Sequence, residues 1–308
     1  MSQTDRPAAP DGAGVTFLGV GRMGEAMVER LLAGGVGVAA WNRTPARLDG
    51  VVGRGASALA APAGSAAPVA ISMVLDDAAL DALWQRPDGL LSGPTPPAVW
   101  LDCSTVSVAA SSRAAAAAAS SNVDFVCAPV SGNPGVVRAG NLIFAASGPA
   151  PAVARVLPLL DVIGRRTLVV GDAHQARVVK LCVNAVLAIH AQALAEALVL
   201  AERNGVRRSA LMEFINDSAV GSPFTRYKTD AFVGLDLTPA FTPEGQRKDL
   251  RLALGLAAEG EVPLPLVSAT EVIYSRLVAS GLGAGKDFAA LLLLAARDAG
   301  LELEPEAG

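Results

Sequence analysis

The sequence predicts an α/β protein in which a doubly wound, parallel sheet is followed by an all-α C-terminal domain. Short apolar runs alternate with helical segments up to about Gly171, which is the pattern of consecutive βαβ units. Only helical patterns follow from His174 onward. A glycine-rich turn also stands directly after the first apolar run and before the first helical segment, as expected at the start of such a sheet.

The predicted strands are short apolar runs, several of which end at Asp or Ser. They cover residues 14–20, 36–41, 69–75, 98–102, 123–128, 142–147 and 167–170. Helices are predicted between most of them, at 25–33, 44–49, 76–83 and 107–121, and the last is dense in alanine, the strongest helix former. Because helices connect successive strands, we expect a parallel sheet with right-handed crossovers.

The second half is predicted to begin with one long helix, because residues 174–204 contain neither Gly nor Pro and Gly205 follows as a helix stop. Further helices are predicted at 208–218, 222–233, 242–259, 264–280 and 287–299. We therefore expect a loose tail at 1–11, a sheet domain at 12–173 and a helical domain at 174–308.

The composition argues against several classes of protein. A net charge of −4 over 308 residues, without a basic cluster, disfavours nucleic acid as a partner. The apolar stretches 181–201 and 288–296 are interpreted as buried helices, so we expect no membrane insertion. Cys103, Cys127 and Cys182 form neither a disulfide framework nor a zinc pattern, and we expect them reduced and buried in a cytoplasmic protein without a bound metal.

The glycine-rich turn is Gly19-Val20-Gly21-Arg22-Met23-Gly24, which fits the G-x-G-x-x-G pattern of a Rossmann-type, dinucleotide-binding domain. The first glycine permits a tight turn, the second lets the backbone approach a pyrophosphate, and the third lets the helix pack on the strand. Glycine is frequent in this chain, so the pattern alone is also compatible with a structural turn. Its position between a strand and a helix favours the cofactor site.

The residues after the second strand predict which dinucleotide binds. An NAD site would place Asp or Glu here to hold the ribose 2′-hydroxyl, whereas this chain has Asn42, Arg43 and Thr44. Arg43 offers a fixed planar charge for a 2′-phosphate, and its neighbours offer neutral hydrogen bonds. We infer NADP(H) over NAD(H); the alternative is that Arg43 is a solvated surface residue.

The candidate catalytic pair is Lys180 and Asn184, which are four residues apart and share one face of the long helix. Apolar neighbours at 178, 179 and 181–183 are expected to desolvate the amine and lower its pKa, so that it can exchange a proton with a developing alkoxide. Spacing alone is equally compatible with a lysine that snorkels at the helix edge. His174 and His190 are interpreted as a capping residue and a core residue.

Together these motifs resemble the β-hydroxyacid dehydrogenase family, which includes 3-hydroxyisobutyrate dehydrogenases and glyoxylate/succinic semialdehyde reductases. The resemblance covers nearly the whole chain. It rests on residues 19–24, Asp-Cys-Ser-Thr-Val-Ser at 102–107, Ala-Pro-Val-Ser-Gly at 128–132, Lys180-x-x-x-Asn184 and Lys248-Asp249-Leu250. The family implies hydride transfer between a nicotinamide cofactor and a small carboxylate substrate, a 3-hydroxy acid or its semialdehyde, and assembly as a homodimer or homotetramer.

The resemblance also implies a role for individual residues. Lys180 matches the catalytic lysine, and Asn184 matches the residue that hydrogen-bonds the substrate beside it. The loop that holds the substrate carboxylate is matched by Ser131 and Gly132. The cofactor contacts implied, in addition to Gly19, Gly21, Arg22, Met23, Gly24, Asn42, Arg43 and Thr44, are Val74, Leu75, Thr105 and Lys248.

Three departures from the family pattern surround the expected substrate pocket. Asn133 follows Gly132 where the family usually has a glycine, and we interpret it as a contact to a polar group of the substrate. His174 and Ala176 occupy the places of two glycines before the lysine. The asparagine pair that commonly follows the lysine is reduced to Asn184.

Two other functions remain open. An imine reductase would carry a similar Trp-Asn-Arg-Thr segment, but such enzymes typically have Asp or Tyr where this chain has Lys180. A non-catalytic NADP-binding module occurs in one branch of the family; the retained lysine and the lack of a basic appendage argue against it.

Overall fold

The structure, a computed structural model, describes residues 14–306, so the tail predicted at 1–11 lies outside the described residues. The chain forms two compact units, Met1–Lys180 and Leu181–Gly308. The division falls inside helix α7 (Gln175–Arg203), whose first turns therefore belong to the first unit.

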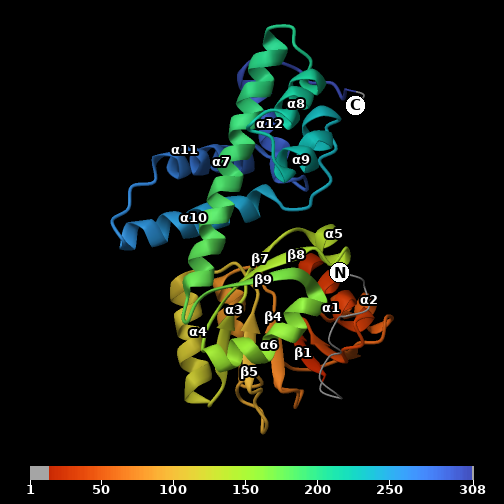
Figure 1. The fold of residues 1–308 in the computed structure, drawn as a ribbon, viewed down its shortest axis with the longest axis vertical. Helices are drawn as coiled ribbons and strands as arrows, with labels where there is room; N and C mark the ends of the chain where they lie inside the picture. Colours follow the sequence, from red (N-terminus) through yellow and green to blue (C-terminus); the bar gives the residue numbers. More distant parts are fainter. Residues whose placement is uncertain (1–13, 307–308) are drawn as a thin grey trace. The chain divides into compact units, whose positions relative to one another are not determined.

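The first unit is built on one sheet, which has nine strands among the described residues (Figure 1). The strands are β1 (Val15–Leu18), β2 (Val38–Trp41), β3 (Ser57–Ala58), β4 (Val69–Ser72), β5 (Val99–Asp102), β6 (Asp124–Cys127), β7 (Val130–Ser131), β8 (Leu142–Ser147) and β9 (Gly164–Gly171). The order β3-β2-β1-β4-β5-β6 is parallel throughout, which confirms the predicted Rossmann-type topology. The strand order reverses between β1 and β4, and dinucleotides bind beyond the carboxyl ends of strands at such a point.

Helices cover both faces of this sheet. They are α1 (Arg22–Ala33), α2 (Asp49–Val52), α3 (Asp77–Gln85), α4 (Val108–Ser120), α5 (Pro134–Arg138) and α6 (Ala150–Ile163). Consecutive strand residues enter different cores: Phe17 packs with α1 and α6, whereas Leu18 packs with α3 and α4. Both faces of the strands are thus buried, which is why they appear in the sequence as continuous apolar runs.

The far end of the sheet departs from the expected parallel arrangement. Strand β8 runs antiparallel to both β6 and β7, while β9 is parallel to β8. A parallel return needs a crossover of about a dozen residues or more, usually with a full helix, and only the five-residue α5 lies between β7 and β8. The sheet is therefore predominantly, not entirely, parallel.

The second unit is helical, as predicted. With the rest of α7 it contains α8 (Arg208–Asp217), α9 (Pro223–Val233), α10 (Pro243–Glu259), α11 (Pro265–Ser280) and α12 (Leu291–Asp298). Two predicted helix starts have clear caps: Ser222 forms a capping box with Thr225 at α9, and the Thr242 hydroxyl accepts a hydrogen bond from Gly245 N at 3.2 Å.

Helix α7 has the length and composition of a membrane-spanning helix, with a mean hydropathy of 1.7 over its most apolar 18-residue window. Its buried residues, among them Ala188, Leu194 and Leu198, form the core of the second unit together with residues of α8–α12. Packing inside the unit thus explains part of the apolar composition of α7, because 39% of that window is buried.

Candidate functional site

The glycine-rich turn has the backbone that its sequence predicts. Gly19 has φ +98°, and a Cβ there would lie 2.4 Å from Met73 O. A Cβ on Gly24 would lie 2.1 Å from Gly19 O, so α1 could not pack this closely on the turn with any other residue. Gly21, in contrast, faces open space. Glycine is therefore needed at 19 and 24 for packing and at 21 only for access, which is what a pyrophosphate cradle requires.

Asn42 braces this turn from the end of β2. Its Oδ1 accepts a hydrogen bond from Val20 N at 2.9 Å, and its Nδ2 donates to Thr44 O at 2.9 Å. Arg43 and Thr44 are exposed beside it, as is Arg22 at the start of α1. The structure thus brings the two predicted cofactor segments together, with Asn42 as the link.

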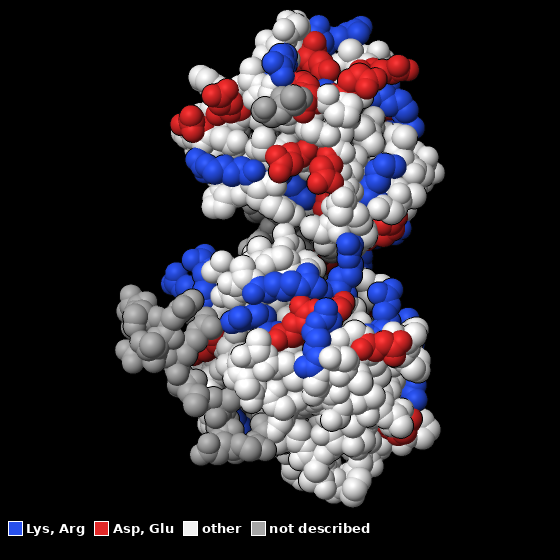
Figure 2. All heavy atoms as spheres, turned by 90° about the vertical axis from the view of Figure 1, so that its right-hand side faces the viewer, with Lys and Arg blue, Asp and Glu red and all other residues white. Residues whose placement is uncertain are grey.

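Some arginines of this unit are held in ion pairs with carboxylates. Lys and Arg stand among Asp and Glu on the face that Figure 2 shows. Arg54 and Arg138 each form an ion pair with Glu29, at 3.3 and 2.8 Å. Within residues 14–306, no carboxylate lies within ion-pair distance of Arg43, so its charge is available to an anion.

Polar side chains meet at the carboxyl ends of β4 and β5. Asp102 is fully buried, and its Oδ1 accepts hydrogen bonds from Ser72 Oγ at 2.5 Å and Ser104 Oγ at 2.7 Å. Ser104 Oγ in turn accepts from Val74 N at 2.9 Å, which fixes the backbone of one predicted nicotinamide contact. Leu75, a second one, is 70% exposed, and a third, Thr105, is half-buried directly after Ser104.

Arg177 completes this group, although nothing in the sequence analysis singled it out. It lies in the first turn of α7 with its side chain buried, and its guanidinium is ion-paired with Asp102. Burial acts to lower the pKa of Arg177, but Cys127 and Asp102 raise it, and the net pKa lies above its ordinary value. Arg177 therefore keeps its charge, and its ion pair with Asp102 ties the start of α7 to the end of β5.

The start of α7 has further ties to the first unit. Ser147 Oγ donates to Ala173 O at 2.9 Å and accepts from Ala176 N at 3.1 Å. His174 directly precedes the helix, and its Nε2 lies 3.2 Å from Ser112 Oγ, while the side chain that bonds Ala176 N is Ser147. Burial, and then the charge of Arg177, lower the pKa of His174, so the ring is neutral near pH 7.

Lys180 follows on the next turn of α7 and is half-buried. The expected cause of desolvation is wrong: Val178, Val179 and Val183 are 39, 37 and 44% exposed, and only Leu181 is buried among its apolar neighbours. Cys182 is also exposed, contrary to prediction, whereas Cys103 and Cys127 are buried and free. An apolar stretch of sequence does not reveal whether other residues of the chain cover it, and this face of α7 is left exposed.

The predicted substrate loop follows β6. Ser131 and Gly132 are exposed, and Gly132 has φ +143°, a conformation that favours glycine. Asn133 caps α5, because its Oδ1 accepts a hydrogen bond from Val136 N at 3.0 Å. That oxygen is therefore committed to the backbone, which leaves the amide nitrogen for any substrate contact.

In the second unit, Asn184 and Lys248 share one buried carboxylate. Asn184 Nδ2 donates to Asp249 Oδ2 at 2.5 Å, and Lys248 Nζ lies 2.7 Å from Asp249 Oδ1. Gln246 Nε2 also donates to Asn184 O at 3.0 Å. Asp249 thus orients the amide of Asn184. The Lys-Asp-Leu motif included Asp249, but the spacing of the motifs could not predict that Asn184 is its partner.

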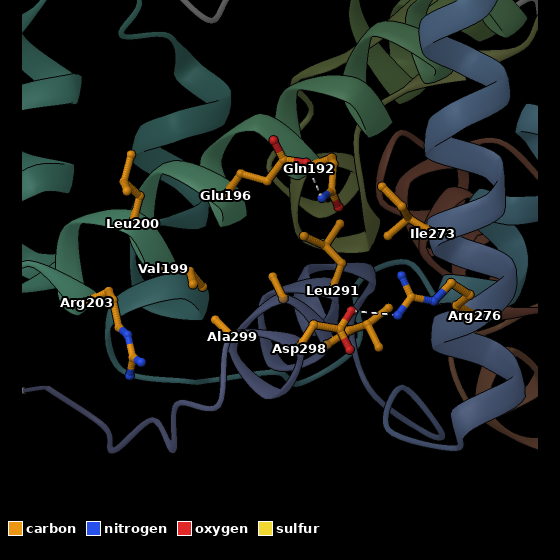
Figure 3. Close-up of a pocket in the computed structure, with 12 residues that line it drawn as sticks. Gln192, Glu196, Val199, Leu200, Arg203, Ile273, Arg276, Leu291, Asp298 and Ala299 are labelled. Carbon is orange, nitrogen blue, oxygen red and sulfur yellow. Dashed lines mark hydrogen bonds and ion pairs between the residues drawn. The ribbon is translucent and has the colours of Figure 1, made fainter.

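A surface pocket of about 510 Å³ lies elsewhere in the second unit (Figure 3). Its lining comes from α7, α11 and α12 and includes Leu200, Ile273 and Leu291. None of the predicted site residues lines it. Within residues 14–306 no three His, Cys, Asp or Glu side chains gather as a metal site would require.

Comparisons with known proteins agree with this arrangement. Residues 14–171 match the family model described as the NAD binding domain of 6-phosphogluconate dehydrogenase, and residues 175–295 match the one described as NAD-binding of NADP-dependent 3-hydroxyisobutyrate dehydrogenase. Glyoxylate/succinic semialdehyde reductase 1 of Arabidopsis thaliana is 32% identical over 281 residues, which cover 90% of this chain and 96% of that protein.

Two further proteins are similar along most of their length. The 3-hydroxyisobutyrate dehydrogenase of Pseudomonas aeruginosa is 33% identical over 272 residues, covering 85% of this chain and 91% of that protein. The solved structure of Mycobacterium tuberculosis 3-hydroxyisobutyrate dehydrogenase with L-serine is 28% identical, with a TM-score of 0.82 and coverage of 92% of this chain and 98% of that one. The chain therefore belongs to the family of NAD(P)-dependent hydroxyacid dehydrogenases that includes 3-hydroxyisobutyrate dehydrogenase and glyoxylate/succinic semialdehyde reductase.

Proposed function

We propose that the protein is an NADP(H)-dependent oxidoreductase that interconverts a small 3-hydroxy acid and its semialdehyde or oxo acid. The observation that carries the proposal is the anchoring of α7. Arg177 in its first turn is buried and ion-paired with Asp102 at the carboxyl end of β5, and the glycine-rich turn follows β1 at the same edge of the parallel sheet. This anchoring supports a position for Lys180 at the edge where a dinucleotide would bind.

The choice of NADP(H) is supported by the residues present. The open backbone at Gly21 and the unpaired N–H groups at the start of α1 suit a pyrophosphate, and Arg43 suits a 2′-phosphate. Val74, Leu75 and Thr105 follow β4 and β5, where the nicotinamide end would lie. When bound, the cofactor supplies or accepts the hydride at the substrate carbonyl carbon.

Proton transfer is assigned to Lys180. In the reductive direction its ammonium donates a proton to the oxygen that gains negative charge, and in the oxidative direction the neutral amine takes the proton from the hydroxyl group. Asn184 lies one turn further along the same face of α7, with its Nδ2 held by Asp249, and orients the reacting oxygen. Ser131 and Gly132 present small side chains and backbone N–H groups to the carboxylate.

The test is a substrate panel with purified protein, monitored by the absorbance of the reduced cofactor. We expect NADPH oxidation with succinic semialdehyde or glyoxylate, and a lower kcat/KM with NADH. Turnover of cyclic imines alone would assign the protein to imine reduction. NADPH binding without turnover of any aldehyde or imine would identify a non-catalytic module, and either result would overturn the proposal.

The expected location and assembly are further proposals. Cys103 and Cys127 are free although both are buried in the same unit, which supports a reducing compartment such as the cytoplasm. Exposed apolar side chains on α7, Val186 and Leu200 among them, support a homodimer or homotetramer.

A further inference from the structure

Arg177 is the most heavily engaged side chain at the start of α7. It is 1% exposed, and each of its three nitrogens donates. Nε donates to Ser111 Oγ at 2.7 Å, Nη1 to Ser104 O, and Nη2 to Asp102 O at 3.3 Å and to the Asp102 carboxylate. Acceptors on β5, on the segment after it and on α4 therefore hold one side chain, which fixes both the position of the helix start and its rotation.

The same contacts reach the predicted nicotinamide contacts. The other oxygen of Asp102 accepts from Ser104, and Ser104 Oγ accepts from Val74 N. The Ser104 carbonyl, which Arg177 also holds, directly precedes Thr105. One continuous set of hydrogen bonds thus joins the backbone at Val74 and Ser104 to α7, three residues before Lys180.

We propose that Arg177, through Asp102, is a positioning residue that sets the place of the Lys180 amine relative to the nicotinamide contacts. The inference rests on the proposed function, because it presumes that Lys180 transfers the proton. Residues at i and i+3 are neighbours on a helix, so a shift or rotation at Arg177 moves Lys180 directly.

A role in folding alone does not account for this arrangement. A buried ion pair is costly to desolvate, and apolar residues of similar volume often stabilise a protein as well or better. Ser147 already holds the start of α7 through Ala173 and Ala176. What the guanidinium adds is a rigid fork with several fixed directions, which restricts geometry more than it adds stability.

The central variant is Arg177→Lys, which keeps the buried charge opposite Asp102 but loses the fork. We expect the thermal midpoint to stay near that of the wild type, while kcat falls roughly 10- to 100-fold, since a misplacement of about 1 Å can cost that much. The dissociation constant for NADPH should change little, because Arg177 contacts neither the glycine-rich turn nor Arg43, the groups proposed to hold the phosphates. If Arg177→Lys keeps both the thermal midpoint and the kcat of the wild type, the proposal is overturned.

Arg177→Gln and Lys228→Gln form a matched pair of variants. Lys228 forms an equally buried ion pair with Asp287 at 2.5 Å, but in the second unit, so both variants leave a carboxylate opposite an amide. We expect both to lose stability and only Arg177→Gln to lose kcat, measured at a temperature where both are folded. Equal losses of kcat would contradict a positioning role. Should Arg177→Gln not fold, Asp102→Asn/Arg177→Gln, which leaves no buried charge, takes its place.

A labelling experiment separates this inference from the proposed function. The chain has four lysines, so acetylation of Lys180 can be followed by peptide mass spectrometry. We expect NADP⁺ to slow acetylation of Lys180 in the wild type and to protect it less in Arg177→Lys. Equal protection in both would overturn the positioning role while leaving the proposed function intact. If NADP⁺ does not protect Lys180 in the wild type and the wild-type enzyme turns over no substrate, the proposed function fails, and the positioning role fails with it.

Discussion

At the scale of single residues, the proposed chemistry depends on the amine of Lys180. Lys180→Ala should lower kcat by about 100- to 10,000-fold, the usual contribution of a general acid or base, with NADPH affinity unchanged. The measurement is steady-state turnover with the best substrate of the panel. Lys286→Ala is the control, because Lys286 donates only to Leu282 O in the second unit. A loss below tenfold, with folding intact, would remove Lys180 from this role.

Arg43 is the residue on which cofactor preference depends. Arg43→Ala removes a charged hydrogen-bond donor, a change of about 1.5–3 kcal/mol, so the dissociation constant for NADPH should rise roughly 10- to 100-fold while that for NADH stays nearly constant. Fluorescence titration with both cofactors measures this. Arg54→Ala, whose guanidinium is paired with Glu29, should affect neither. Equal losses for both cofactors would contradict recognition of the 2′-phosphate.

Residue types could be predicted from the sequence more easily than their partners. Gly19 and Gly24 were predictable because the backbone leaves no room for a Cβ at either position, and Gly21 because a cofactor needs open access there. Arg177 was not, since an arginine near a helix start normally lies at the surface. Its one sequence signal is Asp102, a carboxylate at the end of a buried strand, which needs a cation if it is buried.

At the scale of elements, Glu306, the last described residue, forms a cap on α8. Glu306 accepts hydrogen bonds from Arg208 N at 2.9 Å, Ser209 N at 3.0 Å and Ser209 Oγ at 2.7 Å. Burial acts to raise the pKa of Glu306, but the hydrogen bonds of Ser209 and Arg208 outweigh it and lower the pKa to about 2. This carboxylate replaces the side-chain cap that Arg207 does not provide.

The depressed pKa predicts a window of acid sensitivity. The folded pKa of about 2 lies below the ordinary 4.5, so the stabilisation is complete above pH 4.5 and is lost as the pH falls toward 2. Its size is of order 3 kcal/mol at most. In denaturant unfolding, the free energy of unfolding of the wild type should exceed that of Glu306→Gln at pH 6, and the two values should approach each other near pH 2.5. A gap independent of pH would contradict the assignment.

Elements were predicted unevenly. Strands buried on both faces and helices with clear caps could be read from apolar runs and from Ser222 or Thr242. The very short β3, β7 and α5 could not, because two to five residues carry no periodicity. Strand β8 runs antiparallel because the segment before it forms only the short helix α5. Local helix propensity does not predict the length of that helix.

At the scale of the whole molecule, the exposed apolar side chains of α7 predict self-association. Val186 and Leu200 are 66 and 67% exposed, and Leu200 also lines the surface pocket of the second unit. Exposed apolar surface of this kind is typical of protein interfaces. We expect a homodimer or homotetramer by light scattering, and a smaller assembly for Leu200→Glu. Val52→Glu, on the first unit, should leave the mass unchanged. A monomeric wild type would refute the prediction.

The ion pair of Asp102 with Arg177 also determines where the polypeptide can be divided. The boundary suggested by the sequence, between residues 173 and 174, would remove the counterion of the buried Asp102 carboxyl, at a cost of several kcal/mol. A nucleotide-binding fragment ending there should aggregate on expression. A fragment extended through residue 180 keeps the Arg177 counterion. We expect that this fragment, unlike the one ending at residue 173, can be purified and titrated with nucleotide.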